Sequence, residues 1–225
     1  MSPEAQVLFW WLAFAGSHTA LSHPPVRSAL VRRLGEGPFQ GLYSVIALAT
    51  FVPLVWTFFA HRAARGVPLP MLAQIPGVRW VTMLLMLVAV LLVVLGFSRP
   101  NPISPLTGRS SGAAGVLRIT RHPAFMGVAV FGLAHLLVNH TALDRVFFGG
   151  MLAYALLGSA HQDWRKRQTA DEPMRRYFAE TSFFPFVAVA TGRNRFAPRE
   201  LSSTAVVAAL LLYALLFTLH HRLFG

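Results

Sequence analysis

The sequence predicts an all-α membrane protein: a bundle of about six transmembrane helices with a short interfacial or re-entrant segment. Composition is the first observation, because hydrophobic residues make up 55% of the 225 residues and charged residues only 12%, against about 25% charged in soluble domains. Six apolar stretches are the second, each close to the ~20 residues that cross a hydrocarbon core. The longest polar interval has only about 40 residues, so we expect one membrane domain over residues 1–225.

The expected helices have recognisable ends. The residue before a proline is pushed out of the α region, so His23 before Pro24 ends the first helix. Pro123 opens the fourth, where its missing N–H group costs nothing. A tight turn from Asn139 to Asp144 joins the fourth and fifth helices into an antiparallel hairpin. The expected ranges are 5–22, 41–60, 80–97, 123–139, 143–161 and 202–220.

The intervals between these helices differ in charge. Intervals 23–40, 98–122 and 162–201 contain 15 of the 20 Arg and Lys residues. Basic loops stay on the cytoplasmic side of a membrane, so we expect 98–122 and 162–201 to be cytoplasmic loops and both termini to be non-cytoplasmic. A bacterial inner membrane is the expected location. Residues 98–115 are rich in Pro, Gly and Ser, which indicates a mobile lid or a solvated connection.

The last interval is expected to contain structure of its own. Residues 163–180 mix charges with aromatic residues, a pattern typical of a helix along the membrane face. The apolar run 182–190 is too short to span a bilayer. It should therefore be interfacial or re-entrant and pack near the site, which makes Ser182 a further candidate residue.

Composition also limits the chemistry. The net charge of +12 is nearly all arginine, and we assign it to loop topology and contacts with membrane lipids. No basic module of soluble size is present, so nucleic acid is not an expected partner. The absence of cysteine excludes disulfides and thiolate ligands. Any metal or haem would have to be held by His, Met, Tyr, carboxylates or water.

Histidines within the apolar stretches are the first candidate site residues. His18 and His135 lie inside expected spans, where a polar aromatic side chain is costly unless it has a partner or faces a cavity. Each is either a ligand or a core residue that joins two helices. Isolated histidines on separate helices do not match the spacing of a zinc site. Haem needs only one or two axial ligands, so it suits them better.

A second group of candidates lies at the ends of the fourth and fifth helices. Arg121 and His122 precede Pro123, and a helix N-terminus with an arginine can bind a carboxylate or a phosphate. Phosphates of lipid headgroups are an equal alternative. Asp163 follows the fifth span, where Arg165 and Arg167 offer a simple ion pair.

Five short motifs, kept in order over residues 5–190, resemble the NnrU family and its relative, 15-cis-zeta-carotene isomerase. They are Phe14-Ala15-Gly16-Ser17-His18, Arg118-Ile119-Thr120-Arg121-His122-Pro123, Gly132-Leu133-Ala134-His135-Leu136-Leu137, Phe148-Gly149-Gly150 and Thr181-Ser182-Phe183-Phe184-Pro185-Phe186. The resemblance implies a polytopic membrane protein. NnrU members are linked by name to denitrification, through nitrite and nitric oxide reduction.

The isomerase branch implies haem b held by histidines, with the iron driving a cis–trans isomerisation. By position His18 matches a proposed axial ligand, and His122, His135 and Asp163 match other motif residues. The branch has a His-His pair in the fifth helix where this chain has Tyr154 and Ala155. His18 with His135 is therefore the expected metal-ligand pair, and Tyr154 either binds the iron or packs.

We therefore expect a haem-b-binding protein that is either a redox protein linked to nitrogen oxides or a carotenoid-type isomerase of a lipid-soluble substrate. One alternative is an S-adenosylmethionine-dependent methyltransferase of a lipid-embedded substrate, because the Arg121-His122-Pro123 run also resembles membrane methyltransferases, in which it helps to hold the cofactor. The other is a non-enzymatic assembly subunit whose histidines only join helices.

Overall fold

The computed structural model describes residues 1–61, 72–104, 112–139 and 141–224, and within these ranges it contains helices and no strand. The helices are α1 (Pro3–Ser22), α2 (Pro24–Leu34), α3 (Glu36–Ala60), α4 (Val78–Phe97), α5 (Pro123–Val138), α6 (Ala142–Gln168), α7 (Glu172–Glu180), α8 (Val187–Ala190) and α9 (Ser203–Phe224), with 3₁₀ turns η1 (Leu72–Gln74), η2 (Gly115–Arg118) and η3 (Pro198–Glu200).

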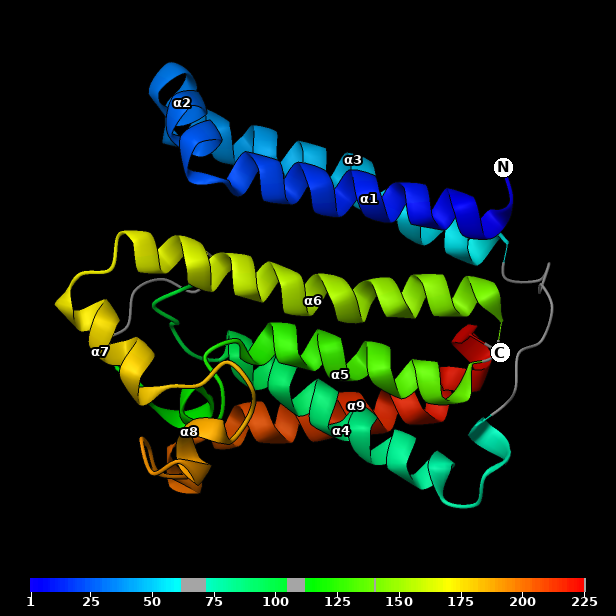
Figure 1. Ribbon diagram of the computed structural model, residues 1–225. Coiled ribbons are helices and arrows are strands. Elements are labelled where there is room, and N and C mark those ends of the chain that lie inside the picture. The colour runs from blue at the N-terminus through cyan, green and yellow to red at the C-terminus, as the bar shows by residue number, and fades with distance from the viewer. Residues whose placement is uncertain (62–71, 105–111, 140, 225) are drawn as a thin grey trace.

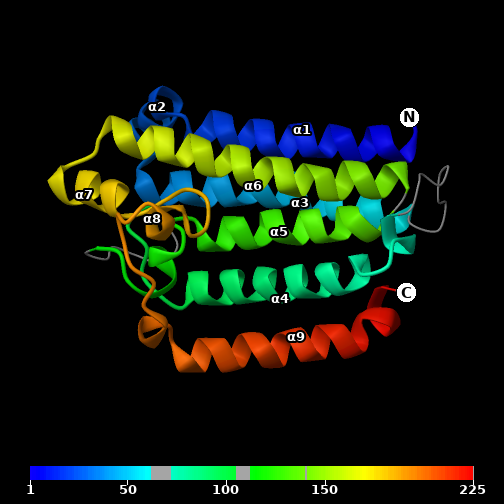
Figure 2. The ribbon, with the colours of Figure 1, turned by 60° about the horizontal axis from the view of Figure 1, so that its bottom comes forward.

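Six long helices form one bundle, which confirms the expected fold class. Figures 1 and 2 show α1, α3, α4, α5, α6 and α9 running side by side along a common direction. Both termini lie at one end of the bundle, and the shorter helices α2, α7 and α8 lie at the other. The six crossings predicted from the sequence would place both termini on one side of a membrane. Their location outside the cytoplasm of a bacterial inner membrane stays a prediction.

The apolar helices mark an integral membrane protein. Among the described residues, three helices are long and apolar enough to cross a membrane by length and composition alone: Glu36–Ala60, Val78–Phe97 and Ser203–His220. α5 is a shorter apolar helix. Large hydrophobic side chains remain exposed along these helices, such as Trp56 and Trp80, as expected of a surface whose solvent is lipid.

The N-terminal polar interval differs from the expectation of a loop. The first helix ends at Ser22, as predicted, but α2 begins at Pro24, because prolines are well placed in the first turn of a helix. Gly35, with a φ of 86°, ends α2 and precedes α3. Only glycine adopts that angle readily. α3 consequently starts at Glu36 rather than near residue 41.

The second hairpin and the region after it follow the prediction more closely. Thr141 and Asp144 form a reciprocal cap that starts α6, and basic residues in its last turn favour its extension to Gln168. The expected interfacial helix is α7, capped by Asp171. The run 182–190 contains only the one-turn α8. Of the predicted lid or connection, residues 105–111 lie outside the described residues.

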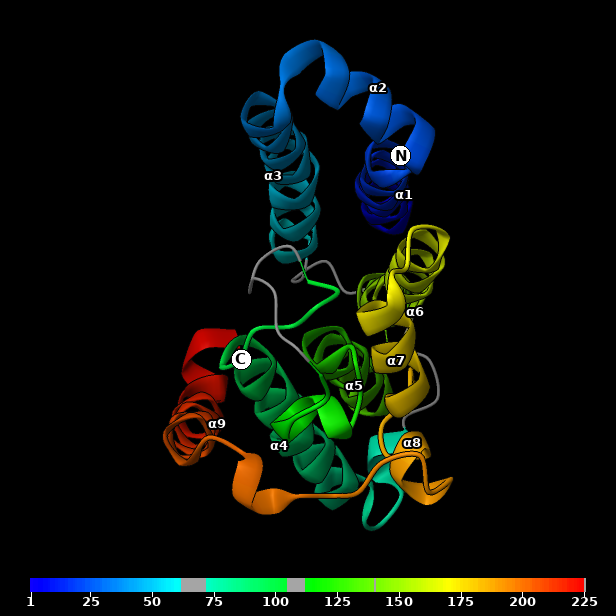
Figure 3. The ribbon, with the colours of Figure 1, turned by 90° about the vertical axis from the view of Figure 1, so that its left-hand side faces the viewer.

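Packing divides the bundle into two hydrophobic clusters. One joins α1, α3 and α6, where the rings of Phe58 and Phe147 stack with centroids 3.9 Å apart. The other joins α4 to η2, α7 and the start of α9. Figure 3 shows α5 and α6 between α1 and α3 on one side and α4 and α9 on the other. Gly132 of α5 lies so close to α6 that a Cβ atom would sit 2.7 Å from the Phe148 carbonyl oxygen.

Candidate functional site

A buried ionic cluster lies where α5 begins and α6 ends. Arg121 and His122 directly precede Pro123, the first residue of α5, and Asp163 lies in the last two turns of α6. Their exposed fractions are 6%, 2% and 8%, respectively. Buried charges are costly unless they are paired, so the arrangement of these three side chains decides whether the end of the bundle is stable.

Both basic side chains bind the same carboxylate. Arg121 Nε donates a hydrogen bond to Asp163 Oδ2 at 2.8 Å, and His122 Nε2 lies 2.7 Å from Asp163 Oδ1. Burial raises the pKa of Asp163, but the hydrogen bond and charge of His122 and the charge of Arg121 outweigh it, so the pKa stays below its ordinary value. The carboxylate is therefore ionised at neutral pH and fixes the orientation of both partners.

The segment after α7 surrounds the Arg121 guanidinium. Arg121 Nη1 donates to the Thr181 carbonyl oxygen at 2.9 Å and to Thr181 Oγ1 at 3.2 Å. The Phe178 ring centroid lies 5.0 Å from Arg121 Cζ, a cation–π contact. The predicted seat for a carboxylate or phosphate at this helix N-terminus is therefore filled by the chain's own Asp163.

Backbone hydrogen bonds hold the short apolar run against this cluster, as expected. The Arg121 amide donates to the Ser182 carbonyl oxygen at 3.0 Å, and the Phe186 amide donates to that of Ile119 at 2.8 Å. Phe186 has a φ of 64°, which a non-glycine residue adopts only where its surroundings impose it. Ser182 Oγ accepts from the Ala188 amide, so this side chain builds the turn.

A second ion pair closes the outer side of the same region. Arg118 Nε and Nη2 donate to the two carboxylate oxygens of Glu200 at 2.8 and 2.9 Å, and the Gly115 amide donates to the same group at 2.9 Å. These hydrogen bonds lower the pKa of Glu200 to about 2. The pair joins η2 to η3 and so ties the loop before α5 to the segment before α9.

His18 lies in a separate cluster of rings inside the bundle. Its imidazole is half-buried, and its centroid lies 4.7 Å from Phe14, 4.5 Å from Tyr43 of α3 and 6.1 Å from Tyr154 of α6. Its nitrogens make no hydrogen bond to any described residue, and neither do the hydroxyls of Tyr43 and Tyr154. Three polar groups therefore meet without satisfying one another.

His135 has a different environment. Its Nδ1 lies 3.0 Å from the Phe131 carbonyl oxygen one turn earlier, and its ring stacks on Phe148 at 4.4 Å. No ring contact among the described residues joins it to His18. The two lie toward opposite ends of the bundle, because His18 precedes α2 and His135 precedes the α5–α6 turn. The structure thus does not bring the expected haem pair together.

The remaining candidates are placed as follows. The predicted ion pair of Asp163 with Arg165 or Arg167 is wrong, because Asp163 binds Arg121 and His122 instead. Arg165 donates to the Ser22 carbonyl oxygen, and Arg167 lies over the Phe178 ring. Tyr154 packs against Trp11, Phe14 and His18. It therefore belongs to the same ring cluster as His18.

Sequence reasoning missed several residues of both clusters. Tyr43 had no signal, because nothing in its local pattern distinguishes it from other aromatic residues of a span. Asn101, whose side-chain amide donates to the Arg121 carbonyl oxygen at 3.0 Å, lies in a loop without a motif. Thr181 did have a signal, since it stands at the start of the Thr181-Ser182 motif.

The fold and the site define a class: a polytopic membrane helix bundle with an Arg–His–Asp cluster at one end and an aromatic histidine cluster within it. The chain belongs to the NnrU family, described as NnrU protein, which matches residues 6–225. It is similar to chloroplastic 15-cis-zeta-carotene isomerases of Arabidopsis thaliana, with 29% identity over 202 residues, and of Zea mays, with 25% identity over 201 residues.

Each of these two alignments covers 86% of this chain but only 52% and 53% of the respective relative. The chain thus spans about half the length of the curated relatives it matches. No solved structure matches the chain significantly.

Proposed function

We propose that this chain is a membrane isomerase that converts a cis double bond of a lipid-soluble polyene to the trans form. The likeness to zeta-carotene isomerases over 86% of the chain supports this class of reaction. The observation that carries the proposal is the cluster of His18, Tyr43 and Tyr154, in which no polar group bonds to a described residue.

Polar groups without partners are costly in an apolar bundle. A buried hydroxyl or ring nitrogen that lacks a hydrogen bond costs about 1–3 kcal/mol on protein mutational scales. His18, Tyr43 and Tyr154 are half-buried, so each bears only part of that cost, and their meeting in one place favours a ligand or cofactor that uses them. A purely structural role would leave the His18 ring with a hydrogen bond, as Nδ1 of His135 has to the Phe131 carbonyl oxygen.

The rings of the cluster suit a hydrocarbon substrate. Phe14 contacts the His18 ring and also Phe51 of α3, at 5.2 Å. A polyene carries no polar group to bind, so an apolar aromatic surface must hold it. In this proposal Phe14 and Phe51 orient the chain of double bonds and exclude water from it.

We further propose that His18 is an axial ligand of haem b. A half-buried imidazole whose nitrogens are uncommitted among the described residues fits this role. When bound, haem iron would supply the electronic change that lowers the order of the double bond and permits rotation. Tyr43 and Tyr154 would line the same space. We assign no second ligand, because His135 belongs to a different ring cluster.

The Arg121–His122–Asp163 cluster has a supporting role in this proposal. It holds the start of α5 against the end of α6 and keeps the bundle closed at that end. The methyltransferase alternative stays a prediction; in the structure Arg121 and His122 both bind Asp163. A role in nitrogen-oxide metabolism stays a prediction.

The test is a paired spectrum and activity assay on the detergent-purified full chain. Protein from haem-replete cells should show a Soret band, and with 15-cis-zeta-carotene in liposomes it should form the trans isomer, measured by chromatography. His18→Ala should lose the band and lower the rate at least about 100-fold, the size expected when a catalytic centre is lost.

His135→Ala is the matched control, because it removes an imidazole from another expected span, outside the His18 cluster, and should retain the band and the activity. A protein without isomerase activity in either the haem-free or the haem-loaded form would refute the proposed reaction. Activity without a Soret band would keep the reaction and refute the assignment of haem. Equal effects of the two alanine variants would indicate that the histidines only stabilise the bundle.

A further inference from the structure

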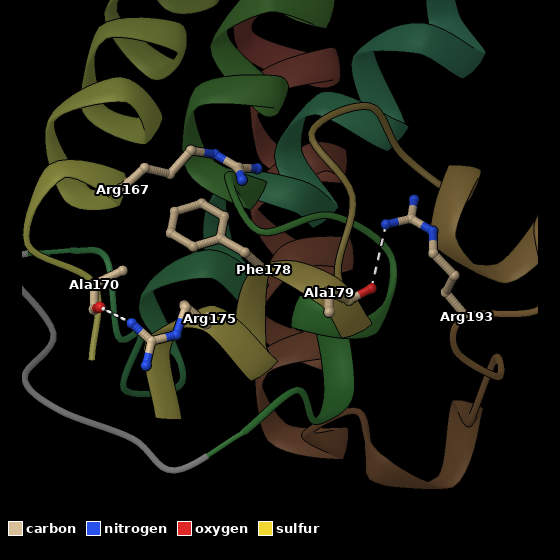
Figure 4. Close-up of a pocket in the computed structure, with 6 residues that line it drawn as sticks. All are labelled: Arg167, Ala170, Arg175, Phe178, Ala179 and Arg193. Carbon is tan, nitrogen blue, oxygen red and sulfur yellow. Dashed lines mark hydrogen bonds between the residues drawn. The ribbon is translucent and has the colours of Figure 1, made fainter. Parts of the chain in front are cut away.

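Three arginines surround an exposed hollow at the end of the bundle where α6 is followed by α7. Figure 4 shows Arg167 and Arg175 near the Phe178 ring and Arg193 on the other side of Ala179, each arising from a different part of the chain. Arg167 comes from the end of α6, Arg175 from α7 and Arg193 from the segment after α8. The hollow has a volume of about 560 Å³ and is lined by Arg167, Ala170, Arg175, Phe178, Ala179 and Arg193.

The hollow lacks negative charge to match these arginines. Among the described residues, no carboxylate pairs with Arg167 or Arg193, and only Arg175 has an acidic partner, Glu172, at 2.9 Å. Arg193 donates to neutral groups, among them the carbonyl oxygens of Ala179 and Thr181 at 3.2 Å. An excess of positive charge on one concave surface is a binding determinant for an anion.

The guanidinium groups are also held in place before any ligand arrives. Arg167 Cζ lies 4.2 Å from the Phe178 centroid, and Phe178 itself is only 5% exposed. Arg175 donates to the Ala170 carbonyl oxygen at 2.8 Å, and backbone carbonyls fix Arg193. Side chains that are already ordered lose little entropy on binding, so this surface differs from a set of mobile arginines.

A phosphate group matches this arrangement best. Guanidinium groups present parallel N–H donors that pair with phosphate oxygens in a bidentate manner. Arg175 already donates to Glu172 through Nε and Nη2 and to Ala170 through Nη1, so Arg167 and Arg193 carry the charge that remains for the oxygens of a tetrahedral anion. We propose that the hollow formed by Arg167, Arg175 and Arg193 binds a phosphate group, supplied by a lipid headgroup or by a soluble phosphate. This inference does not depend on the isomerase proposal.

The site is distinct from the buried cluster yet adjoins it. The Thr181 carbonyl oxygen accepts hydrogen bonds from both Arg121 and Arg193, and the Phe178 ring lies between Arg121 and Arg167. Arg121 is satisfied by Asp163, so it serves as the inner support of the hollow. The three outer arginines remain exposed at its surface.

Binding can be measured on the full chain in detergent at about 150 mM salt, where unspecific surface attraction is screened. The probes are inorganic phosphate and short-chain phosphatidic acid, with affinities from thermophoresis. We expect saturable binding of phosphatidic acid that weakens at least about tenfold in Arg167→Gln and in Arg193→Gln, as expected when a charged hydrogen-bond donor is lost.

Arg176→Gln is the matched control. Arg176 lies on α7 next to Arg175, is paired with Glu180 at 2.7 Å and does not line the hollow. It should change the affinity less than about twofold. Tighter binding of phosphatidic acid than of inorganic phosphate would identify a lipid headgroup as the ligand, and equal affinities would identify soluble phosphate. No saturable binding of either, or an equal loss in Arg176→Gln, would overturn the proposal. Arg167→Gln is decisive if Arg193→Gln fails to fold.

Discussion

Replacing Asp163 by asparagine should destabilise the bundle by about 3–5 kcal/mol, because it leaves a buried guanidinium without its counter-charge. In the structure Asp163 accepts hydrogen bonds from Arg121 at 2.8 Å and His122 at 2.7 Å. Each charge-assisted bond is worth about 1.5–3 kcal/mol, so the two together give about 3–6 kcal/mol. Arg121 keeps its bonds to Thr181 in the variant, which favours the lower part of this range.

Thermal unfolding in detergent, followed by tryptophan fluorescence, measures the effect. For a chain of this size 1 kcal/mol corresponds to about 2–4 °C in Tm, so Asp163→Asn should lower Tm by about 6–20 °C. Glu172→Gln is the control, because it removes a carboxylate from an exposed ion pair and should cost less than about 1 kcal/mol. The double variant with Arg121→Gln should lose less than the sum of the single variants.

The pH dependence gives an independent check. The folded-state pKa of Asp163 lies below its ordinary value, so its contribution is complete above the unfolded pKa of about 3.9. It is lost as pH falls through the lower, folded pKa. The Tm difference between wild type and Asp163→Asn should therefore be constant from about pH 5 to 8 and shrink below about pH 4. A loss under about 1 kcal/mol at pH 7, or one equal to that of Glu172→Gln, would refute the reasoning.

Three further changes test other parts of the structure by the same Tm measurement. Gly132→Ala should cost about 1–3 kcal/mol, because its Cβ atom would meet the α6 backbone. Gly149→Ala, which meets no atom within 4 Å, should be neutral or stabilise by up to about 1 kcal/mol, and equal effects would contradict the close packing of α5 and α6. Glu200→Gln should lower the free energy of unfolding by about 1 kcal/mol or less. In the wild type the stabilisation by Glu200 should be lost only as pH falls toward its pKa of about 2, and a loss near pH 5 would contradict the ion pair. Tyr177→Phe removes a buried hydroxyl that donates to a side-chain amide at 3.3 Å and should cost about 1 kcal/mol, so a gain in Tm would contradict that bond.

The aromatic histidine cluster illustrates how far residue patterns reach. His18 was predictable as a candidate, because an imidazole inside an apolar stretch is costly wherever the helix is placed. Its neighbours Tyr43 and Tyr154 were not, since they come from helices 25 and 136 residues further along the chain. Which faces of α1, α3 and α6 meet depends on packing, and the sequence of one helix does not contain that information.

The ionic cluster shows the same limit in a different way. The motif of Arg121, His122 and Pro123 marked a helix N-terminus that should attract an anion, and the physical reasoning about the helix end was sound. The anion proved to be Asp163, 41 residues away from His122. Local charge favoured Arg165 and Arg167 as its partners, but they lie at positions of α6 that do not place their side chains near the carboxylate.

The sequence by itself determined the solvent, the class of fold and the approximate helices of this NnrU family member, because hydrophobicity over ~20 residues and proline or glycine at helix ends act locally. Only the tertiary structure decided which polar groups are satisfied. His135 bonds to backbone through Nδ1, Arg121 and His122 bind Asp163, and His18 finds no partner among the described residues. Hydrogen bonds and ion pairs act over about 3 Å, so they depend on which distant helices come into contact.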